Sequence, residues 1–384
     1  MQLVAYGAQD IYLTGNPQIT FFKVVYRRHT NFSMEAIQQT WNGNATGTNA
    51  RCTATISRNG DLVYRMYLEL TGAVTGSAKI NPGSQAIKDV ELEIGGQKID
   101  KHTGQWMEVW SELTEENTSG LVGRSDGKSS GNRHSNGTKF QNMSGMGGAY
   151  SAVDSPSIHF VPLRFWFCRN PGLALPLIAL QYHEVKVILN HDLSGVYDNA
   201  DNSPDNKLWC DYIYLDTDER RRFAQVSHEY LIEQVQEQTW STTQKDLNFN
   251  HPVKELIWSK SISSGQIPSL DPVDWKLKLN GHDRFAARNT LYFTRTQVWE
   301  NHSGHGGLGV STGSENAVGR LNDGIAVYSF ALKPEEHQPS GTCNFSRIDN
   351  AQLDSTQTDP CIVYAVNYNV LRIMSGMGGL AYSN

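Results

Sequence analysis

Apolar and polar residues alternate in many short segments of this chain. Residues 89–94 show the pattern clearly, with valine, leucine and isoleucine separated by acidic residues. Alternation with a period of two predicts a half-buried β-strand. The dipeptide Gly95-Gly96 can supply the positive φ angles of a tight turn, and residues 97–100 then return. The segment therefore predicts a β-hairpin.

Other segments share this strand-like composition, and few show the 3.6-residue period of a helix. The further predicted strands are residues 62–70, 159–168, 183–189 and 209–215. Short helices are predicted around residues 105–113 and 218–225. Many short strands separated by Gly, Pro and Asn favour an all-β sandwich over an alternating βα fold.

Three repeats indicate that the sandwich occurs twice. They pair residues 34–41 with 232–240, 89–100 with 274–285 and, more weakly, 165–171 with 330–334. In the second copy of the hairpin, Asn280-Gly281 is a strong signal for a type I′ turn. Because the matches keep their order, we interpret the chain as two copies of one domain of ordinary size.

The repeats also predict the domain bounds. They give an N-terminal arm and lead-in at 1–33, a first sandwich at 34–216, a linker at 217–230 and a second sandwich at 231–384. Around the linker, Asp216, Asp218 and Glu219 lie beside three arginines at 220–222. We interpret this cluster as a solvated linker whose charges compensate locally, rather than as a catalytic carboxylate pair.

Four longer segments are predicted as loops. They are residues 114–157, 194–206, 300–323 and 350–360. Long irregular loops in a compact domain are usually functional or mobile. Variable contacts with partners are therefore expected there, while the strands hold the scaffold.

Composition narrows the possible functions. The chain has 384 residues and a formal net charge of −6, with charged residues making up 19%. A globally basic nucleic-acid binder is therefore not expected, because little here would neutralise phosphates in bulk. The longest apolar run, residues 172–180, is interrupted by Pro176 and is too short to cross a bilayer. No secretory signal is visible at the N-terminus.

The five cysteines suggest neither disulfides nor a zinc site. They are Cys52, Cys168, Cys210, Cys343 and Cys361, widely spaced and without a C-x-x-C motif. Buried free thiols in a reducing compartment are the expected state.

Motifs that could carry chemistry are weak. Residues 123–129 are one residue short of a phosphate-binding loop, and residues 304–309 match G-x-G-x-x-G without a following helix pattern. His302 and His305 could share a metal ion, but no further ligand is near in sequence, so we interpret them as part of a solvated loop. We therefore predict no catalytic residue, no cofactor and no metal site.

Glycosylation sequons are frequent. They begin at Asn31, Asn44, Asn117, Asn136, Asn142, Asn301 and Asn344. Without a secretory signal the usual glycosylation pathway is not implied. Asn117, Asn136, Asn142 and Asn301 fall in predicted loops and are the better candidates for another glycosylation system.

Several segments resemble one known family along the whole chain. They include QLVAYGAQD at 2–10, PGLALPLIALQYHEVK at 171–186 and PSGTCNFSRIDN at 339–350, together with residues 90–100, 216–234 and 368–384. These segments are similar to the major capsid proteins of chlorella viruses and other nucleocytoplasmic large DNA viruses.

The resemblance implies a double jelly roll, two eight-stranded sandwiches in tandem. It also implies a homotrimer that forms a pseudo-hexagonal capsomer of an icosahedral shell, assembled in the host cytoplasm. Expected partners are further copies of the chain, neighbouring capsomers, minor capsid proteins and, through outward loops, a host cell-surface glycan. Direct nucleic-acid binding is not expected.

Two other interpretations stay open. Residues 114–157 look unlike the family's loops, so the chain could be a minor capsid paralogue. A soluble glycan-binding attachment protein would use loops 300–323 or 350–361. A jelly-roll hydrolase is disfavoured, because no set of residues forms a recognisable catalytic site.

Overall fold

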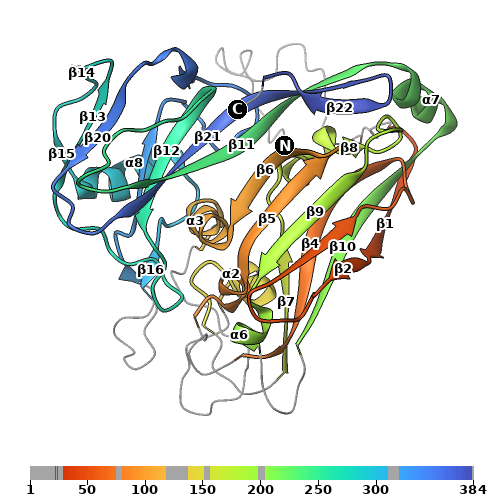
Figure 1. The fold of residues 1–384 in the computed structure, drawn as a ribbon, viewed down its shortest axis with the longest axis horizontal. Helices are drawn as coiled ribbons and strands as arrows, with labels where there is room; N and C mark the ends of the chain where they lie inside the picture. The colour runs from red at the N-terminus through yellow and green to blue at the C-terminus, as the bar shows by residue number, and fades with distance from the viewer. Residues whose placement is uncertain are drawn as a thin grey trace, which may run out of the picture.

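The computed structural model describes residues 22, 24, 29–74, 80–117, 137–150, 156–197, 204–309 and 320–382. Two β-sandwiches lie side by side (Figure 1). We name the two sheets of the first sandwich A and B, and those of the second C and D.

The first sandwich contains two five-stranded antiparallel sheets. Sheet A has the order β1-β10-β4-β7 with β8 beside β4, and its strands are β1 (Phe32–Gln39), β4 (Leu62–Ala73), β7 (Pro156–Pro162), β8 (Leu175–Pro176) and β10 (Asp205–Leu215). Sheet B has the order β2-β3-β9-β5-β6, with strands β2 (Trp41–Gly43), β3 (Ala50–Thr55), β5 (Ile87–Ile94), β6 (Gln97–Thr103) and β9 (Val185–His191). Apolar residues such as Leu68 and Leu92 fill the core between the two sheets.

The second sandwich also contains two antiparallel sheets, one of six strands and one of four. Sheet C has the order β11-β21-β12-β18, with strands β11 (His228–Trp240), β12 (Pro252–Lys260), β18 (Ile325–Ser329), β19 (Cys343–Asn344), β21 (Cys361–Met374) and β22 (Met377–Leu380). Sheet D contains β13 (Asp274–Leu279), β14 (His282–Asp283), β15 (Arg288–Asn289) and β20 (Ala351–Ser355). Three tryptophans, Trp240, Trp258 and Trp275, dominate its core. A separate ribbon pairs β16 (Leu308–Gly309) with β17 (Arg320–Leu321).

The two sandwiches have equivalent strand connections. Strands β1, β10, β4 and β7 of sheet A occupy the places of β11, β21, β12 and β18 in sheet C. The hairpin β5–β6 beside β9 corresponds to the hairpin β13–β14 beside β20. This connectivity is that of a jelly roll, so the predicted tandem pair of jelly rolls is confirmed. The first sequence repeat falls on β1 and β11, and the second falls on the two hairpins.

Both predicted helices are present, as α3 (Gly104–Thr114) and α7 (Thr217–Gln225). The other helical segments are α2 (Pro82–Gln85), α4 (Lys139–Ser144), α5 (Trp166–Arg169), η1 (Pro171–Leu173), α6 (Leu193–Tyr197), η2 (Tyr292–Thr296), α8 (Gln297–Asn301) and η3 (Phe345–Arg347).

One predicted strand is wrong in its second half. Residues 159–168 were expected to be extended, but β7 ends at Pro162 and α5 begins at Trp166. Phe165, Trp166 and Phe167 are all at most 1% exposed. A continuous apolar run does not distinguish a buried strand from a buried helical turn, because neither leaves a polar face.

The predicted loops also contain regular structure. Residues 350–360 were expected to be a loop, but β20 lies there, with alternate residues buried. The signal was weak because Leu353 is the one large apolar side chain of that strand. Residues 114–157 include α4, which begins with a capping box between Thr138 and Gln141. Residues 194–206 include most of α6, and residues 300–323 include the β16–β17 ribbon.

Candidate functional site: a buried seam and an uncovered sheet face

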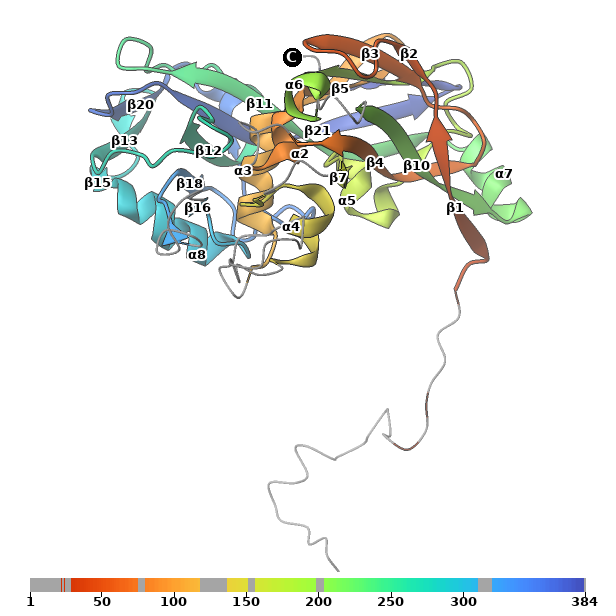
Figure 2. The same ribbon diagram turned by 90° about the horizontal axis from the view of Figure 1, so that it is seen from below.

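Helix α3 forms the centre of a seam between the two sandwiches (Figure 2). The helix begins where β6 ends, and the Thr103 side chain caps it by accepting a hydrogen bond from the Trp106 backbone N–H at 3.2 Å. Met107 belongs to the core of the first sandwich, while Trp106 and Trp110 pack with residues of the second. The helix is therefore buried on both sides.

The apolar part of the seam resembles a protein core. Its main members are Trp106, Val109, Trp110 and Leu113 of α3, and Ile257, Val327, Tyr364 and Val366 of sheet C. All of these side chains are at most 4% exposed. The rings of Trp106 and Tyr364 lie 5.0 Å apart between centroids. Each large side chain buried here contributes about 1.5–3 kcal/mol, so the two sandwiches are held as one unit.

Polar side chains fix the register of the seam. The Gln105 amide donates to Ser259 Oγ at 3.1 Å and to the Lys260 carbonyl at 3.0 Å, and its oxygen accepts from the Ile262 N–H at 3.1 Å. Each of these bonds joins the first sandwich to the second. Hydrogen bonds are directional, so they define one relative placement of the two sandwiches.

A buried ionic cluster lies at another point of the seam. Glu233, 2% exposed on β11, accepts a hydrogen bond from Lys254 Nζ at 2.7 Å and pairs with Arg169 of α5. His337 Nδ1 lies 3.4 Å from the same carboxylate. Burial alone would raise the pKa of Glu233, but Arg169, His337 and Lys254 outweigh it and hold the pKa at about 2. A buried carboxylate held this way needs all of its partners, because removing one leaves a charge uncompensated.

His302 is a buried, doubly paired histidine, so its interpretation as part of a solvated loop is wrong. Its Nε2 lies 2.9 Å from Glu255 and its Nδ1 lies 3.0 Å from Glu335, with the imidazole fully buried. Burial alone would lower the pKa, but the two carboxylates raise it to about 9. Sequence reasoning missed this arrangement because Glu255 and Glu335 are far from His302 along the chain.

Helix α3 carries two buried carboxyl groups that contact each other. Glu108 and Glu112 lie one helical turn apart, are at most 1% exposed and hydrogen bond to each other. Burial first, and then the charge of Glu108, raises the pKa of Glu112 well above its usual value. Two carboxyl groups can share a hydrogen bond only when one of them keeps its proton, so the pair holds a proton inside the seam.

The G-x-G-x-x-G segment at 304–309 packs against this carboxyl pair. Gly304 N–H donates to the Leu113 carbonyl at 2.7 Å, and Leu308 N–H donates to Glu112 Oε2 at 2.9 Å. A Cβ at Gly304 would lie 2.5 Å from backbone oxygens of α3. The glycines thus allow close contact with the end of α3. Next to them, burial lowers the pKa of His305 to about 4.

Among the residues that the structure describes, none covers the outward face of sheet A in the way that α3 covers sheet C. Tyr67 on β4 stacks on Trp209 of β10, with ring centroids 6.5 Å apart and an interplanar angle of 13°. Phe160 on the neighbouring strand β7 meets the edge of Tyr67 and is 37% exposed, and Ile158 is 53% exposed. Exposed apolar side chains grouped on one sheet face indicate an interaction surface.

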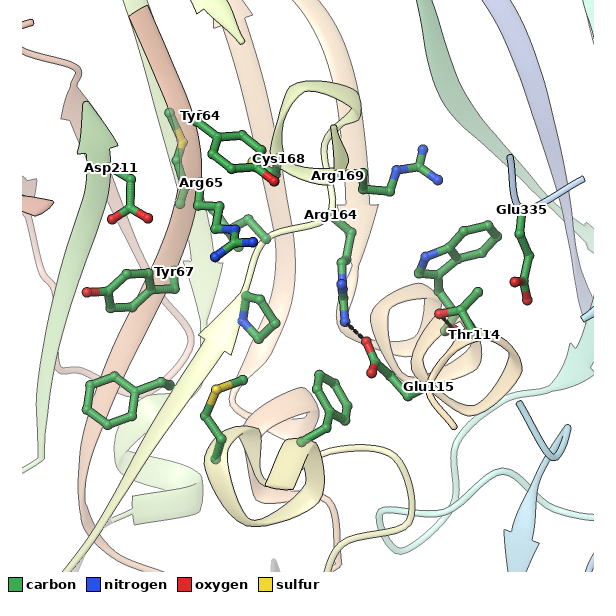
Figure 3. Close-up of a pocket in the computed structure, with 17 residues that line it drawn as sticks. Tyr64, Arg65, Tyr67, Thr114, Glu115, Arg164, Cys168, Arg169, Asp211 and Glu335 are labelled. Carbon is green, nitrogen blue, oxygen red and sulfur yellow. Dashed lines mark hydrogen bonds and ion pairs between the residues drawn. The ribbon is translucent and has the colours of Figure 1, made fainter. Parts of the chain in front are cut away.

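A hollow of about 710 Å³ borders this face. Figure 3 shows Tyr67 and Asp211 on the side of the sheet, with Glu115 and Glu335 towards the second sandwich. Phe140 and Met143 also line the hollow, and Arg164 forms an ion pair with Glu115 inside it. The hollow thus combines apolar side chains with charged groups on both sides, Arg65 and Asp211 on the sheet and Glu115 near α3.

The four predicted turn residues lie at the tips of the equivalent hairpins. Gly95 and Gly96 have φ angles of 59° and 85°, and Asn280 and Gly281 have 52° and 77°. Positive φ at both central residues is the geometry of a type I′ turn. These residues form the turns of the two hairpins.

The candidate glycosylation sites lie in different environments. Asn117 is half-buried just after α3, and Asn136 lies outside the described residues. Asn142 lies in α4 and donates to the Thr138 carbonyl at 3.1 Å, while Asn301 ends α8 and donates to the Gln297 carbonyl at 2.8 Å. The expectation that Asn142 and Asn301 lie in irregular loops is therefore wrong, because both lie in short helices and their side-chain amides donate to the carbonyl four residues earlier.

The remaining charged motif contributes to structure. Asp216 precedes α7, no residue of α7 is buried, and Arg220 pairs with the buried Asp61 at 2.9 Å. In the part of the chain that the structure describes, no group of three His, Cys, Asp or Glu side chains is placed to bind a metal ion. The phosphate-loop candidate at 123–129 lies outside the described residues.

All five cysteines are free thiols. Cys52, Cys210 and Cys361 are buried, and Cys168 and Cys343 are half-buried. Burial raises the pKa of Cys52 and of Cys361 to about 12. Among the described residues, no helix combines the length and apolar character needed to cross a bilayer.

Solved structures of viral capsid proteins share this architecture. VP54 of PBCV-1, fitted into a reconstruction of the virophage Sputnik, superimposes with a TM-score of 0.76 at 36% identity, over 95% of this chain and all of VP54. The Faustovirus major capsid protein superimposes with a TM-score of 0.64 at 14% identity, over 96% of this chain and 94% of its own. The fold therefore places the chain in the class of double jelly-roll viral capsid proteins.

Sequence comparison defines the family. A model described as the N-terminus of the major capsid protein matches residues 20–216, and one described as large eukaryotic DNA virus major capsid protein matches residues 219–379. The major capsid protein of Pyramimonas orientalis virus is 53% identical over all of this chain and 99% of its own length. That of Paramecium bursaria Chlorella virus 1 is 41% identical over the same shares. The chain belongs to the family of major capsid proteins of large eukaryotic DNA viruses, and it is a structural component of the virion.

Proposed function

We propose that three copies of this chain form a ring of six sandwiches, a pseudo-hexagonal capsomer. The observation that carries the proposal is the seam, which holds two sandwiches of equivalent topology in one fixed placement. Chains that associate head to tail form closed rings when the rotation between neighbours allows closure. Each chain contributes its two similar sandwiches as two corners of the ring, so three chains provide six corners.

Capsomers of this shape would tile a flat facet of the shell. Contacts between capsomers can be weak individually because many of them act together. Neighbouring capsomers, minor capsid proteins and a host glycan are the proposed partners, with assembly in the host cytoplasm. Asn117, Asn136, Asn142 and Asn301 are the proposed glycan attachment sites, which intact-mass analysis of protein from virions would test.

We propose the domain bounds 34–216 and 231–384, with an arm at 1–33 and a linker at 217–230. We also propose that the protein is purely structural. The buried titratable groups around Glu233 and His302 support this, because their partners hold the seam and its neighbouring loops together. An assay in which turnover is lost on replacing Asp216 or His305 would contradict a purely structural role.

Light scattering on the purified protein tests the capsomer. The expected particle mass is three times the chain mass of 42.8 kDa. A stable monomer that binds sugars on an array would instead support an attachment protein. The yield of the protein from virions decides between a major component of the shell and a minor paralogue.

A further inference from the structure

The second sandwich contains a counterpart of the seam helix α3. In the first hairpin Thr103 pairs with Asp89, and α3 begins at the next residue. In the second hairpin Asn289 pairs with Asp274, and the helical segment η2–α8 follows. The Asn289 side chain accepts a hydrogen bond from the Leu291 N–H at 3.1 Å, at a place similar to that of the Thr103 cap.

The two helices share their inner contacts and differ in their outer ones. Met107 of α3 and Phe293 of η2 are both 0% exposed and pack into the core of their own sandwich. The opposite side of α3 is covered by sheet C. Along η2–α8, however, Trp299 is 82% exposed and Leu291 is 41% exposed. A tryptophan this exposed indicates a surface that lacks its partner.

The outward faces of sheets A and C also differ, because α3 covers a row of residues in sheet C whose counterpart in sheet A is only half-buried. In sheet C, Ile257 pairs with Tyr364 and with Val327 across the sheet, and α3 covers all three residues at 0% exposure. In sheet A, Tyr67 pairs in the same way with Trp209 and with Pro162.

A sequence marker supports the equivalence of these rows. Pro162 lies three residues before Phe165, and Val327 lies three residues before Phe330. Phe165 and Phe330 begin the third sequence repeat. The row in sheet A is half-buried, and Tyr67 and Pro162 line the hollow beside it.

We propose that the η2–α8 segment of one copy packs on the outward face of sheet A of the next copy, with Trp299 as the main anchor beside Tyr67 and Phe160. The contact would reproduce between chains what α3 and sheet C form within one chain. It rests on the proposed trimer and names the two surfaces that close it. The interface is head to tail, so each copy donates one helix and accepts one.

The test uses one donor variant, one acceptor variant and a matched control. Trp299→Asp removes the anchor, and Phe160→Lys places a charge on the accepting face. Tyr182→Asp is the control, because Tyr182 is 76% exposed and lies between β8 and β9, outside both proposed surfaces. The thermal melting of each variant, diluted to the monomer, shows whether it folds. If Phe160→Lys does not fold, Ile158→Lys replaces it, since Ile158 is more exposed on the same strand.

Sedimentation over a concentration series measures the result. We expect Trp299→Asp and Phe160→Lys to raise the apparent dissociation constant by at least about 30-fold, as loss of an interface anchor does. Tyr182→Asp should leave it unchanged. Mixing the donor and acceptor variants should give one-to-one dimers, because a pair retains one intact interface and no ring can close.

The experiment distinguishes failure of the proposed interface from failure of the proposed trimer. Trp299→Asp protein that trimerises like the wild type would overturn the interface and leave the capsomer standing. Wild-type protein that stays monomeric at every concentration would overturn the capsomer itself.

Discussion

The proton held between Glu108 and Glu112 gives a quantitative prediction for Glu112→Gln. A glutamine keeps an oxygen for the Leu308 N–H, and its amide can donate to Glu108, so the hydrogen bonds survive without a bound proton. The pKa of Glu112 is raised by burial and then by the charge of Glu108. We therefore expect the variant to be more stable than the wild type at neutral pH.

The sign and size follow from proton linkage. Above the ordinary pKa of a glutamate, the unfolded chain has lost the proton that the folded chain keeps. Wild-type stability therefore falls by about 1.4 kcal/mol for each pH unit between the unfolded and folded pKa values. The glutamine variant loses the part of this dependence that comes from Glu112, while Glu108, whose pKa burial also raises, remains in both proteins. The advantage of the variant should be small near pH 4.5 and grow as the pH rises.

Urea unfolding at pH 5 and pH 7, at one protein concentration, measures the difference. Glu116→Gln is the control, because it removes the same charge at an exposed position just beyond α3. The control should change stability by less than about 0.5 kcal/mol at both pH values. An advantage of Glu112→Gln that is equal at pH 5 and pH 7 would refute the shared proton.

Three further predictions concern the seam and the hairpins. Trp106→Ala should cost about 3–5 kcal/mol in urea unfolding, as cavities left by large aromatic residues do; a loss below 1 kcal/mol would mean that the seam is loosely packed. The pKa of His302, raised to about 9 by its two carboxylates against the effect of burial, gives stability that is complete below pH 6.5 and lost as the pH rises through 9. The difference in melting temperature between the wild type and His302→Gln should therefore narrow above pH 9, and a constant difference from pH 6 to pH 10 would contradict the pairing. Gly96→Val and Gly281→Val should each lower the melting temperature and the trimer yield, because a β-branched residue resists positive φ although no neighbouring atom would touch its Cβ; two unchanged melting curves would contradict the turn geometry.

The fold was largely predictable because its signals are local. Alternation in residues 89–94 and the glycine pair after them predict the hairpin β5–β6, and its repeat predicts β13–β14. The strand predicted over Phe165, Trp166 and Phe167 was wrong because a fully apolar run shows neither the period of a strand nor that of a helix. β20 was missed because its alternation rests on few apolar side chains.

The seam was less predictable because its partners are distant in sequence. Glu108 and Glu112 carry no local signal of burial, because it is the second sandwich that covers this side of α3. His302 was predicted to lie in a solvated loop, but it is buried and pairs with Glu255 and Glu335. Trp299 carried no local pattern, and its exposure became informative only by comparison with α3.

The seam also bears on how quickly a ring could form. If the six sandwiches were separate proteins, all six would have to associate from solution, and each association step would cost translational and rotational entropy. Joining two of them in one chain, through the segment that contains α7, makes every second association step intramolecular, so the molecularity of ring formation drops from six to three. Because the two sandwiches of a chain are covalently linked, they can also diverge in sequence. One of them can then keep a long loop that the other has lost, while the two sandwiches are still present in equal numbers.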